Sequence, residues 1–359
     1  MSDKPYVPVS CPFHPTTPIS KIVQAALDED AGDRGDVTTL ATIPPETQAT
    51  AVFTAKGDGV IAGLGVADAV LEAVDPALQV EWRVRDSDRV VPGAVIGVIR
   101  GGARGILVAE RVMLNFMQRM SGIATATAAM VAAMDGLKTR VLETRKTAPG
   151  LRLTDKWAVL IGGGCNHRMG LYDMMMIKDN HIAAAGGIRE AVQRAEEYIR
   201  SQGLETSMRI EVETRTLEEV DEIVEILRAA KKYREAQTAK TAKTAKTAKT
   251  AKTAKTEAGA VEGAAEAEAA ATAPLGAYVS RVMLDNMAKK DPSKEGGVDV
   301  SLLAEAAGRV GDLAETEASG NVTQASIRVI AATGVTYVSV GALTHSVTAL
   351  DISLNIETQ

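Results

Sequence analysis

From residue 138 onward the chain repeats one pattern: a short apolar run, a cluster of polar residues, and then a segment with helical spacing of its apolar residues. Strands that alternate with helices through short connections form a parallel sheet, either open or closed into a barrel. Six runs have the composition of strands, at 139–143, 174–177, 208–212, 278–284, 313–317 and 335–340. Helical spacing occupies 188–202, 217–232 and 323–333. The sequence therefore predicts an α/β fold for this part of the chain.

The first 106 residues lack this alternation and indicate a separate domain of mixed α and β structure. A short amphipathic helix is expected at 20–30, because apolar residues recur there at helical spacing. A long helical pattern follows at 106–134, and Ser121 with Gly122 predicts a kink or break within it. Strand-like runs separated by turn residues predict a small sheet, at 49–55, 79–85 and 95–99.

Polar residues follow nearly every predicted strand of the second part. In parallel α/β structures the loops after the strands converge at one edge of the sheet, where binding sites form. One such cluster would be ordinary loop chemistry, but six of them together predict a site. The clusters are 144–147, 178–181, Glu213, 285–286, 319–321 and 341–343.

The chemistry of these clusters indicates an anionic ligand. Arginine grips planar carboxylates or phosphates with paired hydrogen bonds, whereas lysine acts as a movable point charge. Glu213 and Asp285 could hold sugar hydroxyls or a hydrated Mg²⁺. Small residues at 319–321 and 341–342 precede helical segments and can present backbone N–H groups to a phosphate. The cations are Arg145, Lys146, Arg168 and Lys178, with His167 nearby. A phosphorylated sugar is the predicted ligand.

Composition limits the cellular setting that we expect. At 46% hydrophobic and 24% charged residues, the chain has a globular composition. No apolar run approaches the ~20 residues of a membrane span, and the first 15 residues lack a signal pattern. Cys11 and Cys165 are too few for a disulfide framework or a zinc site. The net charge of −6 argues against nucleic-acid binding. We expect a cytoplasmic protein without nucleic-acid or membrane partners.

One segment differs from the rest in composition. The triplet Thr-Ala-Lys repeats six times from Thr238 to Lys255, and an Ala/Glu/Gly-rich stretch continues to Pro274. Segment 236–274 has almost no large apolar side chain to bury, which predicts disorder, or an exposed helix because alanine and lysine are good helix formers. A basic tether for an acidic partner is the alternative. The segment should occupy the connection between a helix and the next strand, away from the site loops.

Several motifs in one order carry a resemblance to a known family. They are DAGDRGDVT at 30–38, ER at 110–111, SGIAT at 121–125, ETRKTAPGLR at 143–152, GGGCNHRMGLYD at 162–173, IKDNH at 177–181, IEVE at 210–213, MLDN at 283–286 and VGALT at 340–344. The chain resembles quinolinate phosphoribosyltransferase, the decarboxylating enzyme of NAD biosynthesis, over nearly its whole length. The insertion at 236–274 departs from the family pattern.

The resemblance implies the architecture in more detail. An N-terminal α/β sandwich with the bridging helix would span 1–122, and an open, incomplete parallel β/α barrel would span 123–344, with the disordered insertion at 236–274. The segment 345–359 would return to the first domain. Two chains would pair, as a dimer or a hexamer of dimers, so that each barrel mouth is covered by the partner's N-terminal domain.

The resemblance also implies roles for individual residues. The quinolinate pocket would contain Arg111 from the partner subunit, Thr144, Arg145, His167, Arg168 and Lys178. Phosphoribosyl pyrophosphate would contact Lys146, Glu213, Asp285, Ser319, Gly320, Asn321, Gly341 and Ala342. The catalytic set would be Lys146, Lys178, Glu213 and Asp285. Mg²⁺ would arrive with the substrate, reached by Glu213 and Asp285 through water. The helical spacing alone predicts that Arg111 is a surface residue.

The implied reaction joins quinolinate to phosphoribosyl pyrophosphate and gives nicotinate mononucleotide, pyrophosphate and CO₂. Two alternatives stay open at this point. A related enzyme acting on nicotinate would need to grip one carboxylate, which the set Arg111, Arg145 and Arg168 disfavours. A scaffold that uses the Lys-rich insertion as an interaction tail is disfavoured because no strand-end residue is lost.

Overall fold

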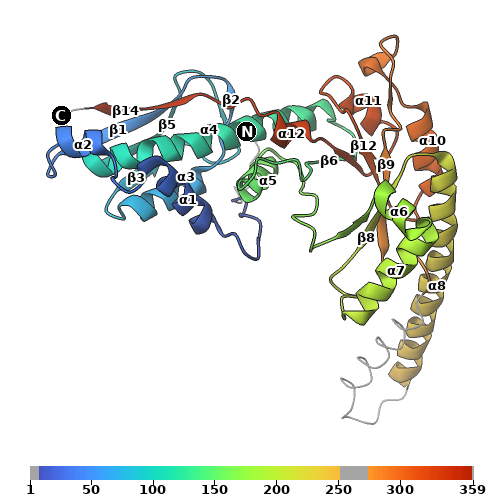
Figure 1. Cartoon of the computed structure of the whole chain (residues 1–359). Coiled ribbons are helices and arrows are strands. Elements are labelled where there is room, and N and C mark those ends of the chain that lie inside the picture. Colours follow the sequence, from blue (N-terminus) through green and yellow to red (C-terminus); the bar gives the residue numbers. More distant parts are fainter. Residues whose placement is uncertain (1–7, 251–273, 358–359) are drawn as a thin grey trace. The chain divides into compact units, whose positions relative to one another are not determined.

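The structure is a computed structural model that describes residues 8–250 and 274–357 (Figure 1). It divides into two compact units, which we describe separately. Unit 1 takes the described residues up to 135 together with 140–169 and those from 340 onward. Unit 2 consists of 136–139 and the described residues of 170–339.

Unit 1 contains a four-stranded antiparallel sheet that joins distant parts of the sequence. Its strand order is β14-β1-β5-β3. Alternate residues of β1 are buried, including Phe53, so one face of the sheet forms a core. The last strand, β14, pairs antiparallel with β1, which brings the end of the described chain back to this sheet. The strands are β1 (Gln48–Ala55), β3 (Gln79–Trp82), β5 (Val95–Gly102) and β14 (Ile352–Glu357).

Helices complete the core of unit 1. The longest, α4 (Ala103–Ala133), buries Ile106, Met113 and Met117 within a single cluster that includes Phe53 of the sheet. The predicted mixed α and β structure of this region is therefore confirmed. The remaining elements are α1 (Ile19–Ala31), α2 (Val37–Thr42), β2 (Gly59–Val60), α3 (Leu64–Val74), β4 (Arg89–Val90), β6 (Arg140–Leu142), α5 (Arg152–Ile161) and α12 (Ala342–His345).

The break expected at Ser121 and Gly122 is wrong, because α4 is one continuous helix of 31 residues. Ser121 exchanges hydrogen bonds with the N–H and carbonyl of Ala62. A Cβ added to Gly122 would lie 2.2 Å from the carbonyl oxygen of Thr348. These two residues thus allow neighbouring segments to approach the helix closely.

A six-stranded sheet runs in the order β6-β13-β12-β9-β8-β7, and within this sheet the pairs between strands of unit 2 are all parallel. Every residue of β8 is buried, as expected for a parallel strand that is covered on both faces. The sheet ends at β6 and β7 in the described chain, so the predicted α/β fold with an open parallel sheet is confirmed. The strands that unit 2 contributes to this sheet are β7 (Met175–Ile177), β8 (Ile210–Thr214), β9 (Val279–Asp285), β12 (Glu315–Ser319) and β13 (Tyr337–Ser339).

Helices connect successive strands of unit 2 (Figure 1). A small hairpin and a 3₁₀ turn also leave the sheet after β9. The helices are α6 (Asp179–Ala185), α7 (Ile188–Ser201), α8 (Leu217–Thr250), α10 (Ser301–Val310) and α11 (Ile327–Ala331), and the hairpin consists of β10 (Lys289–Lys290), η1 (Glu295–Gly297) and β11 (Val298–Asp299). No helix among the described residues is both long and apolar enough to cross a membrane.

Of the two states expected for 236–274, the first part is helical and not disordered, because α8 continues into the Thr-Ala-Lys repeat as far as Thr250. Starting a helix costs more than extending it. The amphipathic start of α8 buries Val220, Ile223 and Leu227, so the helix is already formed when it reaches the repeat. Alanine and lysine then extend it at little cost. The rest of the insertion, 251–273, lies outside the described residues.

Candidate active site

The structure distributes the predicted site residues over both units. Unit 1 contains Arg111, Thr144, Arg145, Lys146, His167, Arg168, Gly341 and Ala342. Unit 2 contains Lys178, Glu213, Asp285, Ser319, Gly320 and Asn321.

In unit 2 the site residues stand at the ends of neighbouring strands. Lys178 follows β7, Glu213 lies near the end of β8, and Asp285 and Ser319 are the last residues of β9 and β12. These strands are adjacent in the order β12-β9-β8-β7, and Ser319 pairs in register with Asp285. The structure thus brings these four side chains to one edge of the sheet, where the loops after parallel strands converge.

The carboxylate of Glu213 is buried and held by two cations. Its Oε2 lies 2.6 Å from Nζ of Lys178, and its Oε1 lies 3.1 Å from a guanidinium nitrogen of Arg215. Arg215 also reaches Asp179 at 2.6 Å and Asp285 at 3.6 Å. A single guanidinium therefore sits among three carboxylates at the ends of three strands. Such charge-assisted hydrogen bonds fix the orientation of the acidic side chains.

Arg215 is the residue that the sequence analysis missed in this half of the site. The signal was present, because Arg215 comes two residues after Glu213, in the loop that follows β8. That loop is ordered by a capping box, in which the Thr216 N–H donates to the Glu219 carboxylate and the Glu219 N–H donates to the Thr216 hydroxyl. The N–H of Asn180 and the cation of Arg215 hold the pKa of Asp179 below its ordinary value.

The loops after β9 and β12 are joined to each other. Asn286 has a φ of 55°, and its N–H donates to the Ser319 carbonyl at 2.8 Å. Its side-chain amide donates to Asp285 at 2.7 Å. A Cβ on Gly320, whose φ is 108°, would lie 2.2 Å from Oδ1 of Asn286, so this position requires glycine. The small residues predicted to face a phosphate are thus also needed for the contact between these two loops.

In unit 1 the loop after β6 meets the segment that carries Gly341. The Thr344 hydroxyl donates to the Lys146 carbonyl at 2.9 Å, and the Lys146 N–H donates to the Thr144 hydroxyl at 3.0 Å. A Cβ added to Gly341 would lie 3.2 Å from Cδ of Lys146, so the lysine side chain runs alongside this glycine. Ala342 begins α12 next to it. The structure therefore brings Thr144, Lys146 and Gly341 together.

His167 and Arg168 lie beside a buried ion pair. His167 is buried, and its N–H donates to Glu143 at 2.8 Å. Glu143 in turn accepts from Nζ of Lys156. Burial raises the pKa of Glu143 to about 7, against the opposing effect of Lys156. Neither Glu143 nor Lys156 was predicted from the sequence to take part in the site.

Two other predicted site residues of unit 1 are arginines, Arg145 in the loop after β6 and Arg111 on α4. The carbonyl of Arg145 accepts from the guanidinium of Arg152 at 3.3 Å, which holds the loop after β6 to the first turn of α5. Arg111 is exposed on α4, as its spacing predicts. An exposed position is compatible with a contact to a second chain.

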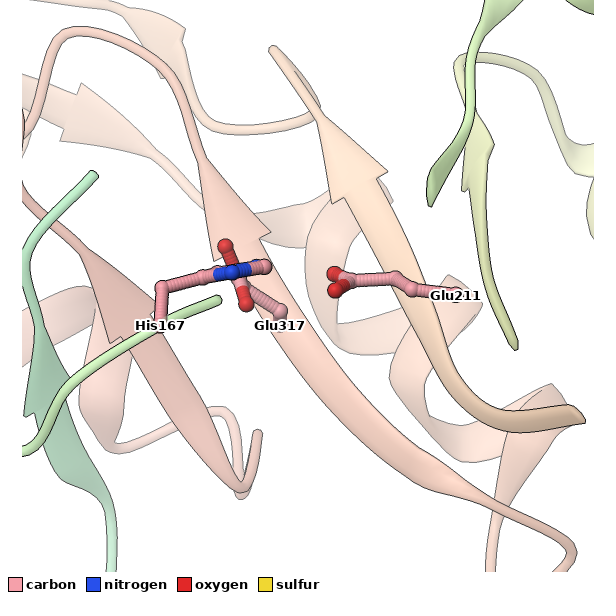
Figure 2. Close-up of side chains that lie close together, drawn as sticks. All are labelled: His167, Glu211 and Glu317. Atoms are coloured by element: carbon pink, nitrogen blue, oxygen red, sulfur yellow. The ribbon is translucent and has the colours of Figure 1, made fainter. Parts of the chain in front are cut away.

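A further layer of charge lies within the sheet of unit 2, two residues before the strand-end side chains. Glu211 and Glu317 are fully buried, and their carboxylate oxygens lie within 4.8 Å of each other (Figure 2). Arg281 on the strand between them reaches Glu211 at 3.7 Å and Glu317 at 3.1 Å, and it stacks over the ring of Tyr337. Arg281 thus supplies the positive charge that two buried carboxylates require.

The fold and these side chains define a class of protein: an α/β enzyme that binds small anionic substrates at the ends of parallel strands. The family descriptions for quinolinate phosphoribosyl transferase match 36–121 with the N-terminal domain and 123–231 and 231–355 with the C-terminal domain. The chain therefore belongs to the quinolinate phosphoribosyltransferase family, and the resemblance noted in its motifs is confirmed.

Similar proteins of known name support this membership. The chain is 48% identical over its whole length to the chloroplastic nicotinate-nucleotide pyrophosphorylase [carboxylating] of Oryza sativa and covers 83% of that protein. It is 35% identical to the enzyme of the same name from Mycobacterium leprae, over 93% of this chain and 95% of the other. Among solved structures, NadC from Streptococcus pyogenes has a TM-score of 0.72 and 31% identity, over 95% of this chain and 98% of that one.

The cytoplasmic location expected from the sequence is wrong in the light of these relatives. The similar proteins of Oryza sativa and Arabidopsis thaliana are named chloroplastic, and one from Nicotiana glauca is named mitochondrial. Our expectation rested on the first residues of the given chain and on two cysteines. Neither feature distinguishes a cytoplasmic protein from one inside an organelle.

Proposed function

We propose that this quinolinate phosphoribosyltransferase joins quinolinate to phosphoribosyl pyrophosphate and releases pyrophosphate and CO₂, giving nicotinate mononucleotide. The observation that carries the proposal is the pair Glu213 and Asp285 at the ends of adjacent strands, held in place by Arg215. Relatives that are named for this chemistry match the whole chain. The roles of individual residues below are part of the same proposal.

The strand-end carboxylates suit the ribose. When pyrophosphate leaves, positive charge develops on the ribose ring, as it does in glycoside hydrolysis. Glu213 and Asp285 can accept hydrogen bonds from the ribose hydroxyls and stabilise that charge electrostatically. Because Lys178 and Arg215 already orient the carboxylate of Glu213, little reorganisation is needed when the charge develops.

The phosphate groups need donors and cations. Lys146 is the cation that the family resemblance assigns to them. Lys178, implied for the quinolinate pocket and the catalytic set, and Arg215 are two further cations at the strand ends that can reach these phosphates. The backbone N–H groups of 319–321 and 341–342 supply neutral donors. Binding of a polyanion would compete with Glu213 and Asp285 for Lys178 and Arg215, so Arg215 can exchange one anionic partner for another without leaving its place.

Quinolinate is a dianion, and its two carboxylates call for two planar, fork-shaped donors. Arg145 and Arg168 supply them, with Thr144 and His167 as further donors. A nicotinate-specific enzyme would need only one of these arginines. Once C1 of ribose has bonded to the pyridine nitrogen, that nitrogen is cationic. The bond from C2 to the adjacent carboxylate can then break, because its electron pair stays beside the positive nitrogen until C2 takes a proton from water.

Mg²⁺ fits this donor set as an ion carried by the substrate. Both strand-end carboxylates already contact cations of the chain, Glu213 through Lys178 and Arg215, and Asp285 through Arg215. Magnesium keeps several waters and needs few carboxylates, so Glu213 and Asp285 would hold it through water. When bound, it would neutralise the charge that develops on the leaving pyrophosphate.

Release of CO₂ tests the proposal directly. Quinolinate labelled at the 2-carboxylate should give labelled CO₂ only when phosphoribosyl pyrophosphate and Mg²⁺ are both present. Glu213→Gln should abolish this release, and nicotinate in place of quinolinate should consume no phosphoribosyl pyrophosphate. Turnover of nicotinate at a rate comparable to that of quinolinate would contradict the proposed substrate.

We also propose that the chain works as a dimer in which Arg111 reaches the quinolinate site of the partner. The exposure of Arg111 on α4 supports this, since an arginine that serves another chain must be accessible. Mixing inactive Arg111→Ala chains with inactive Lys146→Ala chains should form heterodimers with one intact site, so that part of the activity returns. If subunits demonstrably exchange but no activity returns, Arg111 does not act across the subunit boundary.

A further inference from the structure

Two neighbouring residues of α5 carry opposite charges, and both are completely buried. Asp155 and Lys156 each have 0% of their side chain exposed. Buried charges are costly unless they are paired and hydrogen-bonded. Asp155 pairs with Arg119 and also accepts the N–H of Ala148 from the loop after β6. Lys156 pairs with Glu143 and belongs to a different group of contacts.

The ammonium of Lys156 uses all three of its donors. It donates to both oxygens of Glu143 at 2.5 Å and to the carbonyl of His167 at 3.0 Å. Glu143 also accepts the N–H of His167 at 2.8 Å. Both backbone polar groups of His167 are therefore bound by this one ion pair. The pair links the end of β6 and the middle of α5 to the loop that carries His167 and Arg168.

The imidazole of His167 is oriented by the next peptide group. Its Nδ1 accepts the N–H of Arg168 at 2.6 Å. A ring nitrogen that accepts a hydrogen bond carries no proton, so the neutral ring holds its proton on Nε2. The same contact ties the position of the Arg168 backbone to the orientation of the histidine ring.

We propose that Glu143 and Lys156 are positioning residues, which hold His167 as a neutral Nε2–H donor and Arg168 beside it for the binding of quinolinate. The inference rests on the proposed function, which assigns His167 and Arg168 to quinolinate. It adds two residues that contact no substrate, and it assigns His167 the role of a hydrogen-bond donor rather than a cation. The competing explanation is that the ion pair only stabilises the fold.

A double substitution separates the two explanations. Replacing a buried ion pair by apolar side chains of similar volume often leaves stability unchanged or higher. Removing only one partner leaves a buried charge unpaired, which is destabilising. Glu143→Leu with Lys156→Met should therefore fold. Because the backbone of His167 then loses both partners, the dissociation constant for quinolinate should rise at least tenfold. The constant for phosphoribosyl pyrophosphate should stay within twofold.

Three further variants complete the test, in which calorimetry measures the dissociation constants for both substrates. Glu143→Gln with Lys156→Met retains an acceptor for the His167 N–H, so its quinolinate affinity should fall between those of wild type and the apolar double variant. Met113→Leu, a buried change on α4, is the control and should leave both affinities unchanged. Arg168→Lys tests the proposed pocket itself. If the apolar double variant folds and binds quinolinate as wild type does, the positioning role is excluded.

A measurement on the wild-type protein keeps the inference testable if the variants do not fold. Histidine labelled with ¹⁵N should show His167 with a protonated Nε2 and an unprotonated Nδ1 at pH 7.5, assigned by comparison with His167→Gln. A proton on Nδ1, or on both nitrogens, would overturn the proposal. If wild type does not bind quinolinate, the proposed function fails. If wild type binds and Arg168→Lys weakens binding while the apolar double variant does not, only the positioning role fails.

Discussion

The difference between arginine and lysine should be measurable at two positions of unit 1. Arg145 and Arg168 can each give a carboxylate two parallel hydrogen bonds, which the ammonium of lysine cannot do. Arg145→Lys and Arg168→Lys should each weaken quinolinate binding by ~1.5–3 kcal/mol, the range for hydrogen bonds to charged groups. Binding of phosphoribosyl pyrophosphate should change little in both variants. The control Arg194→Lys on α7 should change the affinity for neither substrate. Unchanged quinolinate binding in both variants, measured by calorimetry, would remove these residues from the pocket.

The half-buried carboxylate of Asp86 in unit 1 leads to a prediction about the pH dependence of stability. Asp86 accepts the N–H of Leu64 at the start of α3, and burial raises its pKa to about 6 from 3.8. A carboxyl group whose pKa is raised by folding favours the folded state most when it is protonated. Its contribution is therefore fully present below about pH 4 and is lost as the pH rises through about 6.

Asp86→Asn should remove this dependence. The asparagine side chain can still accept from Leu64, but it carries no charge at any pH. Urea unfolding of wild type should show stability falling between about pH 4 and 6, and the variant should be flatter and more stable at pH 8 by ~1–3 kcal/mol. Equal pH profiles for the two proteins would show that Asp86 is charged in the folded protein without penalty.

Single residues were predictable from sequence where their place in the chain reveals their place in the fold. Glu213 and Asp285 directly end apolar runs, and strand ends are where sites of parallel sheets form. Glu143 and Lys156 could not be assigned in this way. Their partners come from β6, from α5 and from the loop around His167, so the ion pair exists only after packing. The position of Arg281 between two glutamates likewise depends on the strand order, which spacing in the sequence does not show.

At the level of elements, the six strands of the parallel sheet were predictable within a few residues. Runs of valine, isoleucine and methionine bounded by polar clusters are typical of buried strands. The errors were in helices. The sequence predicted that α8 ends near residue 232, which is too early. The composition of the repeat was considered without the helix that precedes it. The break in α4 was predicted from Ser121 and Gly122, whose partners lie far away in the sequence.

Gly122 on α4 therefore makes a prediction about packing. In Gly122→Ala the new methyl group would clash with the Thr348 carbonyl, which is backbone and cannot rotate away. Overpacking of this kind costs ~1–3 kcal/mol or more, although alanine is the better helix former. Gly308→Ala on α10 is the matched control, since nothing lies within 4 Å of its added Cβ. It should stabilise by ~0.5–1 kcal/mol.

Thermal unfolding would compare the two glycine variants. We expect the melting temperature to fall for Gly122→Ala and to rise slightly for Gly308→Ala. A neutral effect at Gly122 would mean that the segment around Thr348 shifts away from α4 at little cost. A lower melting temperature for Gly308→Ala would indicate that free space around the added Cβ is not enough to predict the effect of alanine at a helical glycine of this chain.

At the scale of the whole molecule, the insertion lies in a connection that should not affect the site. Its first residues, 236–250, form the last part of α8, and the rest leads to the start of β9, which runs parallel to β8. The connection therefore enters β9 at the end opposite to Asp285. Glu213 and Asp285 lie on adjacent strands despite the 71 positions between their numbers.

Deletion of 236–273, with a short Gly/Ser linker joining the ends, should consequently leave the enzyme intact. The entropy of closing a flexible connection changes by only ~0.6 kcal/mol for each doubling of its length. The part of α8 before the deletion keeps the side chains that pack, including Val220, Ile223 and Leu227. Turnover and both substrate affinities should stay within about twofold, and stability should stay within ~1 kcal/mol. A full-length variant with the six repeat lysines changed to glutamine is the control for charge. If the shortened protein folds but loses tenfold in turnover while the glutamine variant does not, the length of the connection itself limits how β8 and β9 present Glu213 and Asp285.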